Sequence, residues 1–425
     1  MSREMKDSGI EWIGKIPQDW KLSTIGQYYQ ERNEKVSSLE FSPLSVTKKG
    51  ILPQLEHAAK SDNHENRKLV RNNDFVINSR SDRKMSSGLS HLTGSVSMIN
   101  IVLYSDLMNE KYTKYLLKNY AFAEEFYRWG TGIVDDLWST RWVKMKSIII
   151  PVPPKSTQVS IAHELDNKLI KIDSLIDQSR QSIDELKKYK QSLITEAVTK
   201  GLDPTVEIKD SGIEWIGNIP SNWNVRKIKH EFSVKGRIGW QGLTSKEHQD
   251  KGPHLITGTD FKNGIIDWDS CVRISEERFK EAPEIHIKEN DLLITKDGTI
   301  GKVALAINVP KNVSLNSGVL LIREKSNSSI NKKFMYYNLL SNMFWNWYNS
   351  NDQGSSTIRH LYQGQFYNYS YAQPPLNEQQ QIVEYLDDKV TTIDRLIEDK
   401  TKIIKEFENY KTSLIYEYVT GKKEV

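Results

Sequence analysis

The sequence of 425 residues contains one cysteine, Cys271, and no run of about 18 apolar residues. One thiol can build neither a disulfide framework nor a cysteine zinc site, so Cys271 is expected to be a small, partly buried residue. No transmembrane helix is predicted, and the first residues, MSREMKDSG, lack the apolar core of a secretory signal. These absences predict a soluble, cytoplasmic protein without a membrane partner.

The motifs of several enzyme classes are missing as well. An adenine methyltransferase would be expected to carry an Asn/Asp-Pro-Pro-aromatic tetrapeptide, but the double prolines here are followed by Lys155 and Leu376. No G-x-x-x-x-G-K-[ST] phosphate loop occurs, and residues 298–303 fit a turn beside a strand better. His163 has no second histidine four residues on, and the nine histidines show no catalytic spacing. We therefore predict no catalytic residue and no metal site.

The overall charge is only slightly basic, with a net charge of +4 and an isoelectric point near 8.7. Such an average does not identify a nucleic-acid-binding protein, for which a concentrated basic face is more typical. The length favours two or more domains, and 37% hydrophobic and 10% aromatic residues suffice for ordinary cores.

What the sequence does contain is a long amphipathic segment after Pro153 and Pro154. Apolar residues recur there at three- and four-residue steps from Ile161 to Val198, and Ser156 is a candidate N-cap. A helix of about 40 residues is roughly 60 Å long, which is too long for one small domain to cover. The pattern therefore predicts a long helix that packs against a second one.

Residues 374–420 repeat this sequence pattern, beginning with Pro374 and Pro375 and continuing with Asn377 at the position of Ser156. A second motif, KDSGIEWIG, occurs at residues 209–217 and again at 6–14, and Ile-Pro and then Trp223 or Trp20 follow it. One of the two modules is thus divided between the chain termini. This circular organisation predicts a pseudo-twofold protein with two antiparallel long helices and termini that lie close together.

Between the repeats lie two regions that mix short apolar runs with turn residues, which is typical of strands and loops. Asn73 to Ile77 parallels Asn290 to Ile294, and each region ends in aromatic-rich helical sequence. The predicted fold is α+β, with two similar, diverged α/β domains separated by a coiled coil of two long helices. The predicted boundaries are 1–20, 21–152, 153–223, 224–373 and 374–425, where the second and fourth segments are the globular domains.

The pattern Pro-Pro-x-x-x-Gln-x-x-Ile at 153–161, its counterpart PPLNEQQQI at 374–382, and the divided KDSGIEWIG motif resemble the specificity subunit of type I restriction–modification systems. The resemblance implies that each globular part is a target recognition domain for one half of a bipartite double-stranded DNA site. It also implies two modification subunits that use S-adenosylmethionine, and restriction subunits that use ATP and Mg²⁺. This chain itself would then hold no cofactor and would not be an enzyme.

Simple geometry supports the same role, because two similar domains held apart by a helix suit two half-sites about one DNA turn of 34 Å apart. Since the two domains have diverged, the site should be asymmetric. The candidate DNA-binding residues lie in polar, turn-rich text. In the first domain they are Lys48, Lys49, Arg67, Lys68, Arg80, Arg83 and Lys84, and in the second they are Lys235, Arg237, Trp240, Gln241, Lys296, Lys302 and Arg359.

The long helices carry more apolar positions than one seam requires, which predicts that further helices dock on them. The resemblance assigns those helices to the modification subunits; the alternative is packing against the recognition domains. The candidate residues are Ile170, Leu175, Ile194, Leu396, Ile403 and Phe407. Trp12, Trp20, Trp215 and Trp223 are expected to pin loops to the helix ends.

Two other classes of function remain open from the sequence. A non-catalytic coiled-coil scaffold with two protein-binding domains would show no salt-dependent affinity for DNA. A self-sufficient nuclease or methyltransferase would turn over DNA with Mg²⁺ and S-adenosylmethionine by itself, which the missing motifs argue against.

Overall fold

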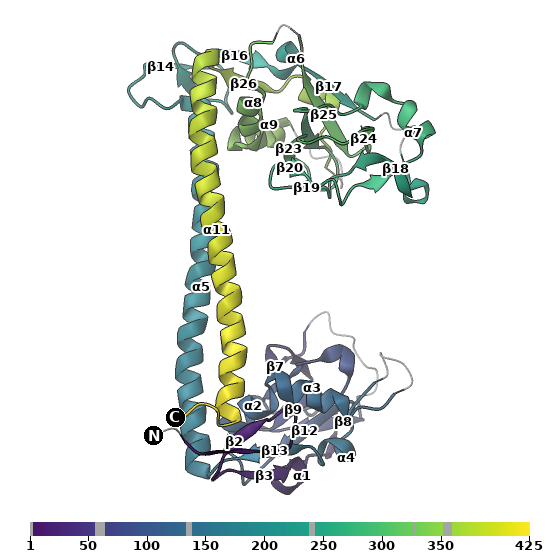
Figure 1. The fold of residues 1–425 in the computed structure, drawn as a ribbon, viewed down its shortest axis with the longest axis vertical. Coiled ribbons are helices and arrows are strands. Elements are labelled where there is room, and N and C mark those ends of the chain that lie inside the picture. Colours follow the sequence, from purple (N-terminus) through teal and green to yellow (C-terminus); the bar gives the residue numbers. More distant parts are fainter. Residues whose placement is uncertain (1–2, 56–63, 133–137, 238–242, 327, 352–358) are drawn as a thin grey trace. The chain divides into compact units, whose positions relative to one another are not determined.

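A computed structural model describes residues 3–55, 64–132, 138–237, 243–326, 328–351 and 359–425 (Figure 1). The chain forms two compact units. Unit 1 comprises Met1–Arg180 together with Thr401–Val425, and unit 2 comprises Gln181–Lys400. Each unit therefore contains one globular α/β part and a portion of both long helices.

Two long helices, α5 (Lys155–Lys200) and α11 (Leu376–Val419), confirm the predicted repeat of helical text (Figure 1). Both begin directly after a double proline, where the missing proline N–H costs nothing. The Gln158 N–H donates to Pro154 O at 3.0 Å, so Ser156 lies in the first turn and is not the N-cap. The same holds for Asn377, because α11 already begins at Leu376.

The two helices pair in antiparallel fashion. An equivalent ion pair joins them in each unit. In unit 2, Lys190 of α5 contacts Asp394 of α11 at 2.5 Å. In unit 1, Lys411 of α11 contacts Asp173 of α5. Lys411 and Asp394 occupy the positions 221 residues after Lys190 and Asp173, so the sequence repeat is also a repeat of contacts.

The apolar stripe of the helices enters the core of both units. The buried stripe residues of unit 1 are Ile161, Leu165, Leu169, Ile172 and Ile176 of α5 with Leu414, Tyr418 and Val419 of α11. Those of unit 2 are Ile194, Ala197 and Val198 of α5 with Ile382, Val383 and Leu386 of α11. The three- and four-residue spacing thus places one face of each helix against its globular part.

The globular part of unit 1 is built on a four-stranded antiparallel sheet in the order β10-β9-β12-β4. Its strands are Ser87–Leu89, Phe75–Asn78, Asn100–Tyr104 and Gln30–Glu31. A second sheet in the order β11-β8-β5 comprises Gly94–Ser97, Arg67–Val70 and Lys35–Val36, and the hairpin β6–β7 comprises Leu44–Thr47 and Gly50–Pro53. Helices α2 (Glu110–Leu117) and α3 (Tyr120–Arg128) precede the return to α5.

The globular part of unit 2 repeats this plan with a wider sheet in the order β17-β25-β22-β23-β20-β19. Its strands are Phe232–Gly236, Val319–Glu324, Leu292–Thr295, Val303–Leu305, Ile265–Ile266 and Phe261–Lys262. A three-stranded sheet in the order β21-β18-β24 comprises Val272–Arg273, Gln249–Ile256 and Val313–Leu315. Helices α8 (Lys332–Leu340) and α9 (Asn342–Asn351) correspond to α2 and α3.

Antiparallel strand pairs at the base of each unit join the repeated motifs to the rest of the fold. In unit 1 they are β1–β2 (Met5–Asp7 and Lys15–Pro17) and β3–β13 (Lys21–Thr24 and Ile149–Val152). In unit 2 they are β14–β15 (Ile208–Asp210 and Asn218–Pro220) and β16–β26 (Asn224–Lys227 and Ser370–Gln373). The duplicated KDSGIEWIG text thus folds into the same hairpin twice.

The weak sequence similarity between the two globular regions reflects an equivalent turn before β9 and before β22. Asn73 and Asn290 have positive φ angles of 69° and 63°, which asparagine tolerates better than most residues. The following Asp74 and Asp291 each accept a backbone N–H three residues upstream, at 2.8 and 2.7 Å. Each carboxylate also receives a bidentate arginine, Arg32 in unit 1 and Arg323 in unit 2. The predicted strands after these turns are confirmed.

The tryptophans of the repeated motif are structural. Trp20 and Trp223 are 1% and 0% exposed, Trp12 is buried against Phe122, and Trp215 is half-buried on the core of unit 2. Cys271 is a free, buried thiol. Within the described residues, no helix combines the length and apolar character needed to span a membrane.

Candidate nucleic-acid interface

A buried glutamine joins each long helix to its globular part. Gln158 Oε1 accepts the Asn109 N–H at 2.8 Å, and Gln158 Nε2 donates to Pro153 O at 3.0 Å. In unit 2, Gln379 accepts the Asn331 N–H at 2.7 Å and donates to Pro374 O at 2.9 Å. Asn109 and Asn331 are the N-caps of α2 and α8, so the glutamine of the Pro-Pro-x-x-x-Gln pattern fixes the globular part on the helix base.

An aspartate about two helical turns later in each long helix repeats this attachment. The Tyr115 hydroxyl donates to Asp166 in unit 1, and the Tyr337 hydroxyl donates to Asp387 at 2.6 Å in unit 2. Burial, followed by the bond to the carboxylate, raises the pKa of both tyrosines. Each globular part is thus held on the long helices by the same polar contacts.

In unit 1 the predicted basic group lies in the turn after the central strand β9. Arg80 Nε contacts Asp82 at 3.1 Å, Arg83 contacts Asp82 at 3.5 Å, and Lys84 contacts Glu124 at 3.0 Å. These side chains keep 42%, 67% and 46% of their surface exposed, so their ion pairs are weak surface contacts that a phosphate could replace. The backbone at Arg80 pairs with Ser139, which brings a distant segment into this patch.

Unit 2 brings three predicted residues to the matching place after β22. The Leu361 N–H donates to Lys296 O at 2.9 Å, so Arg359 lies near Lys296 and its side chain is exposed. Lys296 Nζ contacts Asp297 at 2.7 Å, and Lys302 Nζ donates to Gly258 O at 3.1 Å. His360, which the sequence analysis did not single out, contacts Asp297 at 2.6 Å.

Three further predicted cations are exposed elsewhere. Lys48 and Lys49 lie at the tip of the β6–β7 hairpin, and Lys235 lies on β17. Their side chains are accessible to a phosphate backbone. Trp240 and Gln241 lie outside the described residues.

Two predictions of DNA contact are wrong, because the side chains are buried. Lys68 is 6% exposed and donates to Glu31 at 2.7 Å and to Asn100 O at 2.9 Å. Arg237 is 4% exposed and donates to Leu315 O at 2.8 Å and to Ser314 Oγ at 2.9 Å. Both cations tie strands together within their own unit.

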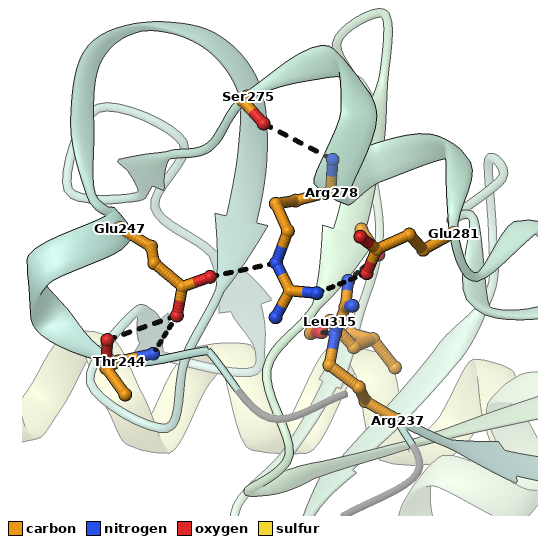
Figure 2. Close-up of polar contacts among 8 residues, drawn as sticks. Arg237, Thr244, Glu247, Ser275, Arg278, Glu281 and Leu315 are labelled. Carbon is orange, nitrogen blue, oxygen red and sulfur yellow. Dashed lines mark hydrogen bonds and ion pairs between the residues drawn. The ribbon is translucent and has the colours of Figure 1, made fainter. Parts of the chain in front are cut away.

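Figure 2 shows Arg237 beside the ion pair of Arg278 and Glu281. Burial, and then the nearby Arg278 charge, lowers the pKa of Arg237. Arg278 also contacts Glu247 at 2.9 Å, and Glu247 accepts the Thr244 N–H at 2.8 Å. Arg67 is an intermediate case, since its half-buried guanidinium donates to Ser95 Oγ at 2.8 Å and burial lowers its pKa.

The apolar residues predicted to bind partner helices differ in their exposure. Ile170, Leu175, Leu396 and Ile403 are 67%, 44%, 44% and 42% exposed. Ile194 is 3% exposed in the core of unit 2, so its prediction as a docking residue is wrong. Phe407 is half-buried against the core of unit 1. The alternative of packing within the chain therefore holds for Ile194.

Residues 220–407 match the family described as the type I restriction modification DNA specificity domain. The type I restriction enzyme MjaVIII specificity subunit of Methanocaldococcus jannaschii is 24% identical over 429 residues, covering 96% of this chain and 94% of that protein. The EcoBI specificity subunit of Escherichia coli is 26% identical over 179 residues, covering 40% of this chain and 36% of that protein.

Two solved structures share the fold at 14% identity. A chain from a study of complex assembly and conformational transition in a type I R-M system gives a TM-score of 0.71, covering 95% of this chain and 98% of that chain. The HsdS subunit from Thermoanaerobacter tengcongensis gives 0.55, covering 98% and 100%.

Two α/β units attached by the same contacts to a pair of long helices define the class of HsdS-like, two-domain proteins. Residues 220–407 form a type I restriction modification DNA specificity domain, and the whole chain is homologous to type I restriction enzyme specificity subunits. Along most of its length the chain is therefore similar to specificity subunits of type I restriction enzymes, and the scaffold alternative is not favoured.

Proposed function

We propose that this chain recognises an asymmetric, bipartite site on double-stranded DNA in the cytoplasm, with one half-site for each unit. Two modification subunits, which bind S-adenosylmethionine, and restriction subunits, which use ATP and Mg²⁺, supply the chemistry. The chain itself binds none of these cofactors. Among the described residues, no group of three or more His, Cys, Asp or Glu side chains could hold a metal ion.

The observation that carries the proposal is one backbone plan with two different sets of exposed polar residues. In both units the same Asn-Asp turn leads into the central strand, β9 or β22. The exposed side chains after that strand differ, because unit 1 has Arg80, Arg83 and Lys84 there and unit 2 has Lys296 and Arg359. Two protein-binding domains of a symmetric scaffold would not require this divergence, whereas two unlike half-sites do.

The test is an exchange of recognition regions. Residues 21–150 are replaced by the equivalent part of a relative, and methylated sites are mapped in cells that contain the chain and its modification subunit. One half of the recognised sequence should change while the other half stays. Changes in both halves would show that the units do not recognise DNA independently. As a control, residues 224–373 are exchanged, which should alter the opposite half.

A binding measurement separates this function from a protein-binding scaffold. The assembled complex should lose DNA affinity steeply with salt, with a slope of log K against log salt of about −0.9 for each phosphate contacted. Affinity independent of salt would contradict the proposal.

A further inference from the structure

In each unit a segment that is distant in the sequence forms a backbone hydrogen bond with the residue directly after the central strand, β9 or β22. The Thr140 N–H donates to Ser79 O at 3.0 Å in unit 1, and the Leu361 N–H donates to Lys296 O at 2.9 Å in unit 2. Counting from the Asn-Asp turns, Ser79 and Lys296 are equivalent positions. The residues beside these bonds, Arg80 with Ser139 and Asp297 with His360, are therefore equivalent pairs, which we call the facing pairs.

The two facing pairs occupy equivalent backbone positions but consist of different side chains. In unit 1, Arg80 and Ser139 form an antiparallel β-bridge, and the Arg80 side chain turns to Asp82. In unit 2, His360 Nδ1 and Asp297 Oδ1 are 2.6 Å apart, and the second Asp297 oxygen contacts Lys296 at 2.7 Å. A changed polar pair on an unchanged backbone is what different half-sites require at a position that recognises bases.

The contacts of His360 determine which ring nitrogen remains for a ligand. Burial opposes ionisation of Asp297, but hydrogen bonds from Lys296 and His360 lower its pKa, so it is a carboxylate. An ionised carboxylate only accepts hydrogen bonds, so Nδ1 carries a hydrogen, and in the neutral form of the ring Nε2 is then an acceptor. Within the described residues no contact occupies Nε2, and the side chain is 37% exposed.

The ring is also held in place. The Tyr348 hydroxyl donates to His360 O at 3.3 Å, the neighbouring Leu361 N–H is bonded to Lys296 O, and the Tyr362 ring lies 5.8 Å from the imidazole centroid. Such pre-organisation reduces the entropy lost when a side chain binds a base edge.

We propose that His360 is a specificity-determining residue for the half-site of unit 2, where Nε2 accepts a hydrogen bond from an exocyclic amino group, adenine N6 or cytosine N4. Asp297 is its positioning residue. A phosphate oxygen is itself an acceptor and cannot bond the neutral Nε2, whereas these amino groups are the donors of the major groove. The inference rests on the proposed function of the chain.

The test maps methylated sites for the complex with modification subunits, carrying His360→Phe, His360→Gln or Asp297→Asn. His360→Phe keeps an aromatic ring without acceptor nitrogens, so discrimination at one base pair of the unit 2 half-site should fall about 10-fold or more. His360→Gln should recognise adenine at that position, because glutamine bonds adenine N6 and N7. Asp297→Asn should relax the same base pair less strongly. His230→Phe, on an exposed histidine of helix α6 (Ile228–Glu231), is the matched control and should leave the sequence unchanged.

Each outcome has one meaning. An unchanged sequence for His360→Phe overturns the inference. If His360→Phe does not fold, Asp297→Asn decides, because an unchanged preference at every base pair of the unit 2 half-site would overturn the inference. Failure of the proposed function is different, since the parental complex would then lack salt-dependent DNA binding or both half-sites would change.

Folding of unit 2 variants is checked at the single cysteine. Burial, and then the charge of Asp260, raises the pKa of Cys271 to about 12, so an alkylating reagent at pH 8 should spare it in every folded variant.

Discussion

Gln158 and Asn109 are 49 residues apart in the sequence and are joined by a 2.8 Å hydrogen bond from the Asn109 N–H to the buried Gln158 side chain. Gln379 and Asn331 repeat this contact at 2.7 Å. The repeated glutamine is therefore retained in both helices for the same physical reason. It pairs buried backbone groups at the junction between a helix base and a globular part.

Gln158→Leu should destabilise unit 1 by about 2–4 kcal/mol, because the Asn109 N–H and the Pro153 carbonyl would each be left without a partner. Hydrogen exchange of the 105–118 peptide should accelerate accordingly. Gln178→Leu, on an exposed glutamine of α5, is the control and should change stability by less than about 0.5 kcal/mol. Equal protection of that peptide in both variants would contradict the assigned role.

Thr157→Glu should stabilise unit 1 by roughly 1 kcal/mol. The indole N–H of Trp223 donates to Glu378 at 3.0 Å, whereas the buried indole N–H of Trp20 has no partner within the described part of the chain. Thr157 occupies the position equivalent to Glu378, and a carboxylate there also favours the helix N-terminus. Urea unfolding measures the change. Glu378→Thr should do the opposite in unit 2, and a loss of stability from Thr157→Glu would refute the equivalence.

The contribution of Lys118 to the stability of unit 1 should become more favourable as pH rises from about 8 to 10.5. Burial, and then the Lys114 charge, lowers the pKa of Lys118 from its ordinary 10.5 to about 8, and its amine donates to Ser87 O at 2.7 Å. In that interval the unfolded chain binds more protons than the folded one, so the penalty for the buried charge disappears as pH rises. The stability of the parent relative to Lys118→Met should increase with pH, and a difference independent of pH would argue against this burial penalty.

A matched four-residue insertion within 176–190 of α5 and at the corresponding place in α11 should lengthen the DNA spacer by one or two base pairs. Four residues add about 6 Å of helix, close to two base-pair steps of 3.4 Å, and rotate the apolar stripe by only about 40°. Assembly with modification subunits should persist. A two-residue insertion rotates the stripe by about 200° and should abolish assembly. Mapped sites with the original spacer would show that the helices are tethers without a fixed length.

The parts of the fold that could be predicted are those where local pattern and packing agree. The spacing of Ile161, Leu165 and Leu169 specifies one buried helix face, and the run from Phe75 to Ile77 specifies a buried strand. Lys68 could not be recognised as buried, because its partner Glu31 lies 37 residues away. The Asp297–His360 pair was missed for the same reason, as its members are 63 residues apart and only the backbone pairing at Lys296 brings them together.

Unit 1 cannot be completed until the last turns of α11 are made, because Leu414, Tyr418 and Val419 are part of its core, whereas every residue of unit 2 lies between Gln181 and Lys400. During synthesis on the ribosome, the usual order in which the N-terminal domain matures first is therefore reversed. The globular part of unit 1 is made first, but its core stays incomplete while unit 2 can already fold. A prematurely terminated chain would expose that unfinished core, which gives cellular proteases a means to remove it before it can enter a complex.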